Sequence, residues 1–101
     1  MIVYEVELDV DAALADEYLP WLRAHVQQML SLPGFEGAEV FERLEPVPEP
    51  GRVGYCVHYR LRDRSDFDAY LRDHAPRMRE QGLRAFGERV RASRGLLQAC
   101  G

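Results

Sequence analysis

The first residues of the chain alternate between apolar and polar side chains, with Val3 as the exception. The apolar positions are Ile2, Tyr4, Val6, Leu8 and Val10, and acidic residues stand between most of them. A period of two places successive side chains on opposite faces of an extended chain. The pattern therefore predicts a β-strand over residues 2–10 with one apolar and one acidic face.

After this strand the apolar positions recur at helical spacing. They are Leu14, Tyr18, Leu22, Val26 and Met29. This spacing predicts an amphipathic α-helix, because residues three or four apart share one helical face. Asp11 is placed to cap its start, and Pro20 should kink the helix or make it restart near Tyr18. Pro33 and Gly34 predict its end, since proline cannot extend a helix and glycine accepts a left-handed conformation.

Two strands and a stiff connection follow. Residues 36–45 alternate weakly, which favours a strand at a sheet edge, and the proline-rich segment 46–51 leads out of it. Residues 53–62 alternate well and predict a third strand. Its apolar side holds Tyr55, Val57, Tyr59 and Leu61, and its other side holds Cys56, His58, Arg60 and Arg62.

A second amphipathic helix is predicted after the third strand. Ser65 is a favourable N-cap for it. Its apolar face comprises Phe67, Tyr70, Leu71 and His74. Pro76 should break the helix, so that a second short piece carries Met78 and Gly82 ends it. Residues 88–97 then predict the last strand.

The element order βαββαβ predicts an α+β, ferredoxin-like fold: an antiparallel sheet in the order 4-1-3-2 with two helices on one face. The charges support this order. The first strand carries Glu5, Glu7 and Asp9, whereas the third and fourth strands offer arginines and His58 on the same face. An acidic strand between two basic ones gains opposite-charge pairs worth roughly 0.2–1 kcal/mol each.

Length and composition limit the organisation and the partners of the protein. A chain of 101 residues fits one domain, residues 1–101. A net charge of −4, with arginines scattered among 17 acids, argues against nucleic acid as a partner. No apolar run is long enough for a membrane span. Two cysteines without short-range spacing, and no leader sequence, predict a reduced, cytoplasmic protein.

Several segments resemble a known superfamily. The stretches LPGFEGAEVF and VHYRLRDRSDFDAYLRDH are similar to the dimeric α+β barrel proteins, which include antibiotic biosynthesis monooxygenases, haem-degrading monooxygenases and stress-responsive proteins. MIVYEVELDV, WLRAHVQQMLSLPGF and DHAPRMR are most similar to a bacterial branch of unknown function. The resemblance implies a homodimer whose two sheets pack face to face, with small ligands between the helices and the sheet of each subunit.

The functional residues of these enzymes match only in part. The haem-degrading branch implies an asparagine on the first strand, an aromatic residue on the second helix and a later haem-ligating histidine. Tyr70 falls at the aromatic position, but Val6 and Glu7 stand where the asparagine is expected, and Glu80 lies near the histidine position. The antibiotic-tailoring branch implies Asn, Trp and Tyr around the substrate, and this chain contains no asparagine.

Two histidines and several aromatic residues are expected to meet between helices and sheet. The predicted ligand-binding residues are Tyr4, Trp21, His25, Tyr59, Tyr70, His74 and Met78. Such a pocket, aromatic with few polar groups, is typical of small-ligand sites. A histidine in it is a candidate general base, and His74 is the catalytic candidate. The alternative is that His25 and His74 are packed boundary residues and that Trp21 belongs to the core.

Metal and cofactor chemistry is not expected. His58 should lie on the sheet face opposite His25 and His74, so three imidazoles cannot converge on one ion. The chain has no glycine-rich phosphate loop, no CxxC and no HExxH. Cys56 shares a strand face with His58, but their spacing disfavours a nucleophilic pair. The sequence thus predicts no metal and no cofactor.

Phe41 is expected on the sheet face away from the helices, where a large apolar side chain favours contact with a second subunit. Two functions remain open. The first is a homodimer that holds a small apolar or aromatic molecule, with monooxygenase-like activity as a possibility implied by the superfamily. The second is a non-enzymatic dimerisation or regulatory module without a ligand pocket.

Overall fold

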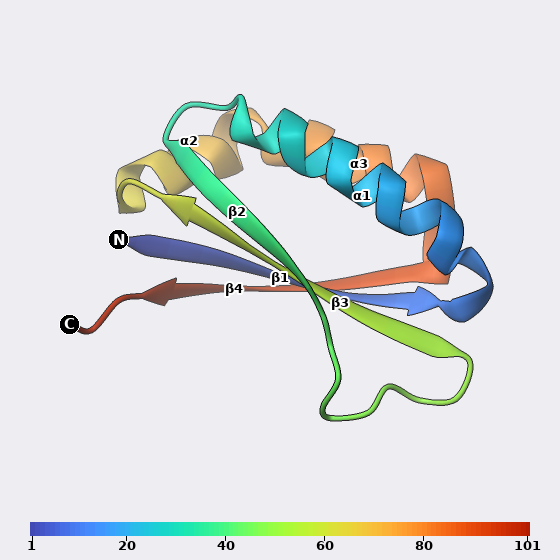
Figure 1. Cartoon of the computed structure of the whole chain (residues 1–101). Coiled ribbons are helices and arrows are strands. Elements are labelled where there is room, and N and C mark those ends of the chain that lie inside the picture. The colour runs from blue at the N-terminus through green and yellow to red at the C-terminus, as the bar shows by residue number, and fades with distance from the viewer.

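A computed structural model describes residues 1–101 as a four-stranded antiparallel sheet with its helices on one face (Figure 1). The main elements are β1 (Ile2–Asp11), α1 (Ala15–Leu30), β2 (Phe35–Glu42), β3 (Arg52–Leu61), α2 (Arg64–Asp73), α3 (Ala75–Phe86) and β4 (Val90–Gln98). The strand order is β2-β3-β1-β4. The α+β, ferredoxin-like prediction and its strand order are therefore confirmed, with the second helix divided in two.

The core lies between the sheet and the helices. In β1 every second residue from Ile2 to Val10 is buried, as the alternation predicted. Tyr4 pairs with Tyr59 of β3, and Val6 pairs with Val57. The helical side is closed by the predicted stripe of α1, whose buried members are Tyr18, Leu22, Val26 and Met29. Burying a large apolar side chain contributes about 1.5–3 kcal/mol, so these central layers hold the fold together.

Helix α1 runs through Pro20 without interruption, so the predicted restart near Tyr18 is wrong. A short 3-10 turn, Ala12–Leu14, precedes the helix. The Asp11 carboxylate caps that turn by accepting a hydrogen bond from the Ala13 backbone N–H at 3.0 Å. After α1 the chain turns at Gly34, whose φ of 84° lies in the left-handed region that glycine accepts without strain.

The break between α2 and α3 falls at His74, as the proline in this segment suggested. Pro76 lies in the first turn of α3, where its missing N–H costs no hydrogen bond. Two details of the prediction are wrong. Helix α3 continues past Gly82 to Phe86 and ends at Gly87, whose φ is 57°. Leu71 is exposed instead of lying on the buried face.

The N-cap of α2 is Asp63, not Ser65. The Asp63 carboxylate accepts a hydrogen bond from the Asp66 backbone N–H at 3.0 Å. Ser65 lies inside the first turn and donates its hydroxyl hydrogen to the same carboxylate at 2.6 Å. Both residue types cap helices well, so the sequence alone did not separate them.

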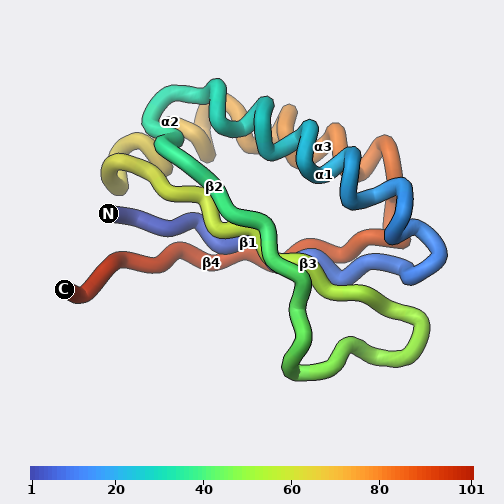
Figure 2. Tube along the Cα trace, in the orientation of Figure 1, coloured from blue at the N-terminus to red at the C-terminus, as the bar shows by residue number.

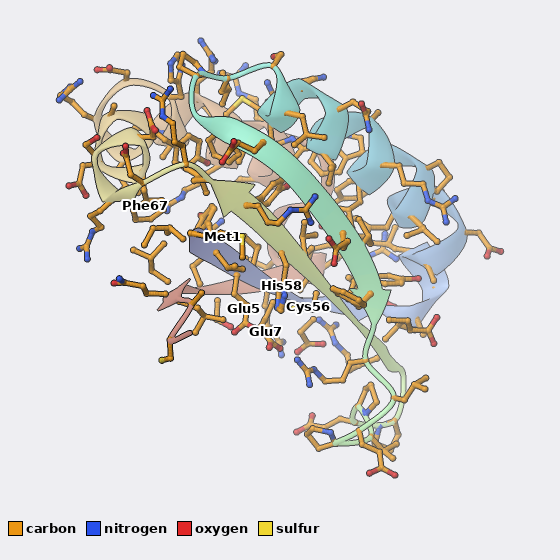
Figure 3. All side chains as sticks on the ribbon, turned by 60° about the vertical axis from the view of Figure 1, so that its left-hand side comes forward. Met1, Glu5, Glu7, Cys56, His58 and Phe67 are labelled. Carbon is orange, nitrogen blue, oxygen red and sulfur yellow. The ribbon has the colours of Figure 1, made fainter.

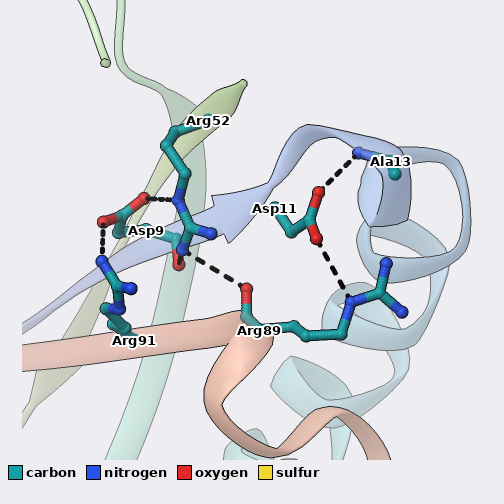
Figure 4. Close-up of polar contacts among 6 residues, drawn as sticks. All are labelled: Asp9, Asp11, Ala13, Arg52, Arg89 and Arg91. Atoms are coloured by element: carbon teal, nitrogen blue, oxygen red, sulfur yellow. Dashed lines mark hydrogen bonds and ion pairs between the residues drawn. The ribbon is translucent and has the colours of Figure 1, made fainter. Parts of the chain in front are cut away.

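The sheet face away from the helices is charged, and its pairs follow the predicted order. Glu5 pairs with His58 of β3 at 2.8 Å, and the two residues stand directly opposite each other in the register. Asp9 pairs with Arg52 at 2.7 Å and lies 3.9 Å from Arg91 of β4 (Figure 4). The acidic strand thus lies between two basic ones. The segment 43–51 extends from this sheet away from the helices (Figure 2).

None of the helices has the length and hydropathy that crossing a membrane would require.

Candidate functional site

A cavity of about 320 Å³ lies between the helices and the sheet. Residues of α1, α3, β1, β3 and β4 line it, together with Tyr70 of α2. The sequence-predicted residues in its wall are Tyr4, Trp21, His25, Tyr59, Tyr70 and Met78. The structure therefore brings six of the seven predicted residues together around one space. Their binding of a ligand stays a prediction.

His74 is the predicted residue that does not line this cavity. It is half-buried at the junction of α2 and α3, with a φ of −131° that belongs to neither helix. Its Nδ1 accepts a hydrogen bond from Arg77 Nη2 at 3.2 Å. His74 thus lies at the junction of two helices, outside the cavity wall, and a catalytic role for it stays a prediction.

His25 is the histidine of the cavity. Its ring stacks on Trp21 with centroids 4.9 Å apart and planes 12° from parallel. Nδ1 donates to the side-chain oxygen of Gln81 at 3.2 Å, which leaves Nε2 with a free lone pair. Burial lowers the pKa of His25, so the ring is neutral at physiological pH. A neutral imidazole with a free nitrogen can take a proton from a bound ligand.

The aromatic wall is made largely of tyrosines. The ring of Tyr4 lies 5.8 Å from Tyr59 and 5.7 Å from Tyr70, between centroids. Burial raises the pKa of Tyr18, Tyr59 and Tyr70 well above the ordinary tyrosine value. These side chains are therefore neutral phenols, which offer flat apolar faces together with hydroxyl groups that can donate hydrogen bonds.

The wall also contains two charged residues that were not predicted from the sequence, Arg79 of α3 and Arg94 of β4. Arg79 Nη2 donates to the Tyr4 hydroxyl at 3.2 Å. Arg94 stands opposite Val6 in the sheet register, so it belongs to the helix-facing side of β4. A signal was present in the sequence, because Arg94 keeps the period-two spacing of Val90 and Ala92.

Gly82 also belongs to the cavity wall, in the middle of α3. A Cβ atom at this position would lie 3.4 Å from the ring of Trp21. This is an ordinary van der Waals distance, so the residue expected to end the helix lies inside α3, beside Trp21 of α1.

The opposite sheet face carries a second group of chemically active side chains. Figure 3 shows Glu5, Glu7, Cys56 and His58 on this face, away from the helices. Ligand atoms of Glu5, Cys56 and His58 all lie within 4.8 Å of one another. These are residue types that bind zinc, so this set could hold a divalent metal ion. Burial raises the pKa of the Cys56 thiol, and the nearby carboxylates of Glu7 and Glu5 add to this effect.

Phe41 lies on this same open face, as predicted. Its side chain is 45% exposed, and its ring centroid lies 5.4 Å from that of His58 in an edge-to-face arrangement. His58 is separated from His25 by the sheet, so the histidines of the chain do not share one site.

Fold and cavity together define the class: an α+β protein with the architecture of the antibiotic biosynthesis monooxygenase structures. A Deinococcus radiodurans protein assigned as such a monooxygenase superposes with a TM-score of 0.73 at 16% identity, covering 100% of this chain and 94% of the other. HapK from Hahella chejuensis gives 0.71 at 19% identity, with the same coverage of 100% and 94%. A Nitrosomonas europaea protein with the same assignment gives 0.70 at 13% identity, with 100% of both chains covered. At such identities these likenesses establish the fold alone.

The sequence matches the family described as a domain of unknown function (DUF4286) over residues 1–100, and the chain belongs to this family. The predicted resemblance to a branch of unknown function with the dimeric α+β barrel architecture is thereby confirmed. Among curated proteins, none matches the sequence.

Proposed function

We propose that the protein is a homodimer that binds a small aromatic molecule between the helices and the sheet of each subunit. The observation that carries this proposal is the cavity lined by Tyr4, Tyr59, Tyr70 and Trp21. Ligand sites typically enclose about 300–1,000 Å³. At about 320 Å³ the cavity stands at the lower end of that range, which suits a ligand of one or two rings.

The dimer is supported by the open sheet face. Phe41 places a large, 45% exposed apolar ring on this otherwise charged face, and a second subunit would remove that ring from water. A two-fold pairing of identical faces is the commonest arrangement of soluble oligomers. The resemblance to the dimeric α+β barrel proteins supports the same face as the contact surface. The free cysteines Cys56 and Cys100 support a reducing, cytoplasmic location.

A monooxygenase-like activity is the chemistry this site would best support. His25 presents a neutral imidazole to the cavity and can remove the proton of a bound phenol. With dioxygen as the oxidant, one oxygen atom would bond to a ring carbon of the phenolate and the other would leave as water. The ring itself would supply the electrons and become a quinone. The cavity argues against the alternative function, a dimerisation or regulatory module without a pocket.

The cavity can be filled by mutation to test ligand binding. Ala92 of β4 lies in the cavity wall and is exposed, so Ala92→Phe should block the space while the fold is kept. Ala85→Phe on α3 is the matched control, because Ala85 is exposed and lies outside the cavity wall. Thermal unfolding would be followed with a panel of one- and two-ring phenols and aryl acids. Trp21, the single tryptophan, reports occupancy of the cavity by its fluorescence.

We expect stabilisation and a fluorescence change in the wild type and in Ala85→Phe, and a loss of both in Ala92→Phe. A ligand at about 100 times its Kd should stabilise the native state by about 2.7 kcal/mol. The proposal would be overturned if no member of the panel binds, or if Ala92→Phe binds as well as the wild type.

A further inference from the structure

The charges in the cavity wall are all of one sign. Its ionisable side chains are Arg79, Arg94, His25 and the tyrosines, and no aspartate or glutamate lines it. Burial raises the pKa of Tyr18, Tyr59 and Tyr70 and lowers the pKa of His25, so burial holds these four side chains neutral. The chain as a whole carries a net charge of −4, so the cavity wall has a charge opposite in sign to that of the whole protein.

Arg94 differs from the two arginines that precede it in the chain. Arg89, just before β4, pairs with Asp11 at 3.2 Å, and Arg91 of β4 lies 3.9 Å from Asp9 on the charged sheet face (Figure 4). Arg94 lies on the helix-facing side, and its side chain makes no hydrogen bond or ion pair. Its five N–H donors, in a fork that matches a carboxylate, are therefore free to meet a ligand.

Arg79 brings a second guanidinium group to the same wall from α3. One of its nitrogens donates to the Tyr4 hydroxyl, and it too has no acidic partner. The positive charges of Arg79 and Arg94 both act on Tyr70, where they oppose the effect of burial on its pKa. Two guanidinium groups, one from helix α3 and one from the edge strand β4, thus lie in the same cavity wall as the tyrosines.

From this arrangement we infer that the ligand is an aromatic carboxylate, whose ring lies against the tyrosines and Trp21 and whose carboxylate pairs with Arg94 and Arg79. The inference rests on the proposed function, since it specifies the ligand of the same cavity. Charge-assisted and bidentate hydrogen bonds between Arg and carboxylate are among the stronger polar contacts in proteins. A neutral aromatic ligand would leave both guanidinium groups without a counter-charge.

Matched pairs of acids and amides test the inference by isothermal titration calorimetry. The probes are 2-naphthoate with 2-naphthamide, and biphenyl-4-carboxylate with biphenyl-4-carboxamide, which differ in charge but hardly in shape. A hydrogen bond to a charged group is worth about 1.5–3 kcal/mol. We therefore expect each acid to bind about tenfold to a hundredfold more tightly than its amide.

Two variants locate the effect. Arg94→Gln should reduce the preference for the acid by about tenfold or more, and Arg79→Gln should act in the same direction. Arg91→Gln is the control, because it removes a positive charge from the same strand on the opposite sheet face. It should leave the preference unchanged. Arg94 is exposed, so its substitution leaves the core intact.

The possible failures are distinguishable. If acid and amide bind equally well, and Arg94→Gln binds both as the wild type does, the carboxylate inference is overturned while the aromatic cavity site stands. If neither acid nor amide binds, the proposed function fails and the inference fails with it. If Arg94→Gln and Arg91→Gln lose the preference for the acid equally, the preference comes from the overall charge of the protein. That result would also overturn the inference.

Discussion

Gly34 lies directly against Asp66: a Cβ atom added to Gly34 would come within 2.4 Å of the Asp66 Cβ atom. The contact joins the turn after α1 to the first turn of α2. The Gly34 carbonyl oxygen also accepts a hydrogen bond from the Arg62 backbone N–H at 3.0 Å. This glycine therefore serves two requirements at once, a left-handed φ and close approach of a neighbouring helix.

Gly34→Ala is expected to destabilise the protein more than Gly51→Ala does. Both residues have positive φ, 84° and 79°, so both substitutions meet a backbone cost of about 1–2 kcal/mol. A Cβ atom at Gly51 would have no neighbour within 4 Å, whereas one at Gly34 meets Asp66. Overpacking adds about 1–3 kcal/mol at Gly34 alone. Urea unfolding of both variants measures the difference, and equal losses would contradict the role of the Asp66 contact.

Asp63→Ala should lower the free energy of unfolding by about 0.5–2 kcal/mol, the usual effect of losing an N-cap. Ser65→Ala should cost less, because Ser65 bonds to the capping carboxylate and not to the helix backbone. Hydrogen bonds hold the pKa of Asp63 below its ordinary value, so its contribution is present at neutral pH and is lost in acid. Urea unfolding at neutral and acidic pH checks both points. A larger loss in Ser65→Ala would restore Ser65 as the cap.

His25 should make the protein less stable as the pH falls. Burial lowers its pKa below the ordinary value of 6.5, so the unfolded chain binds the proton more readily than the folded protein does. The contribution of neutral His25 to the free energy of unfolding is complete above about pH 6.5 and declines as the pH falls below this value. Histidine NMR titration should place the His25 pKa below 6.5.

His25→Phe retains a ring against Trp21 but has no proton to bind. Its unfolding free energy should therefore fall less than that of the wild type between about pH 7 and about pH 5. An identical pH dependence in the two proteins would show that His25 is not held in its neutral form by the fold.

Phe41→Glu should convert the proposed dimer to a monomer, because it would bury an unpaired charge in the proposed sheet-to-sheet contact. Size-exclusion chromatography with light scattering measures the change. Leu71→Glu is the control, since Leu71 is an exposed apolar residue on α2, on the helical side of the molecule. A wild-type protein that is monomeric at all concentrations, or a Phe41→Glu variant that stays dimeric, would remove this face from the interface.

The strands were predictable because their two faces meet different surroundings. In β1, and in β3 from Val57 onward, one face is packed and the other carries charge, so the alternation of residues such as Tyr59 and Arg60 reports the burial directly. The charge pattern then placed β1 between β3 and β4. The helix break before Pro76 was equally visible, because proline restricts the residues on both sides of it.

The same dependence of the pattern on burial made the aromatic residues of the candidate site predictable and left its β4 residues unpredicted. The aromatic wall belongs to the packed layers and follows their periodicity. On the β4 side of the cavity Ala92 and Arg94 are exposed, and Arg94 places a charge where the period-two spacing of the helix-facing side favours an apolar residue. His74 kept the helical spacing of the buried face, but the helix ends before it. The spacing of apolar residues predicts which side chains share a helical face, but it does not predict where the helix ends.

The exposed cavity side of β4 separates ligand preference from folding. Residues such as Val57 and Tyr59 hold the core, so any change in their shape lowers the stability of the protein. Ala92 and Arg94 touch the cavity without being buried in that core, so they can change in size or charge at little cost to the fold. Related chains can thus diverge in the molecule they accept by altering one edge strand while the rest of the scaffold is inherited unchanged.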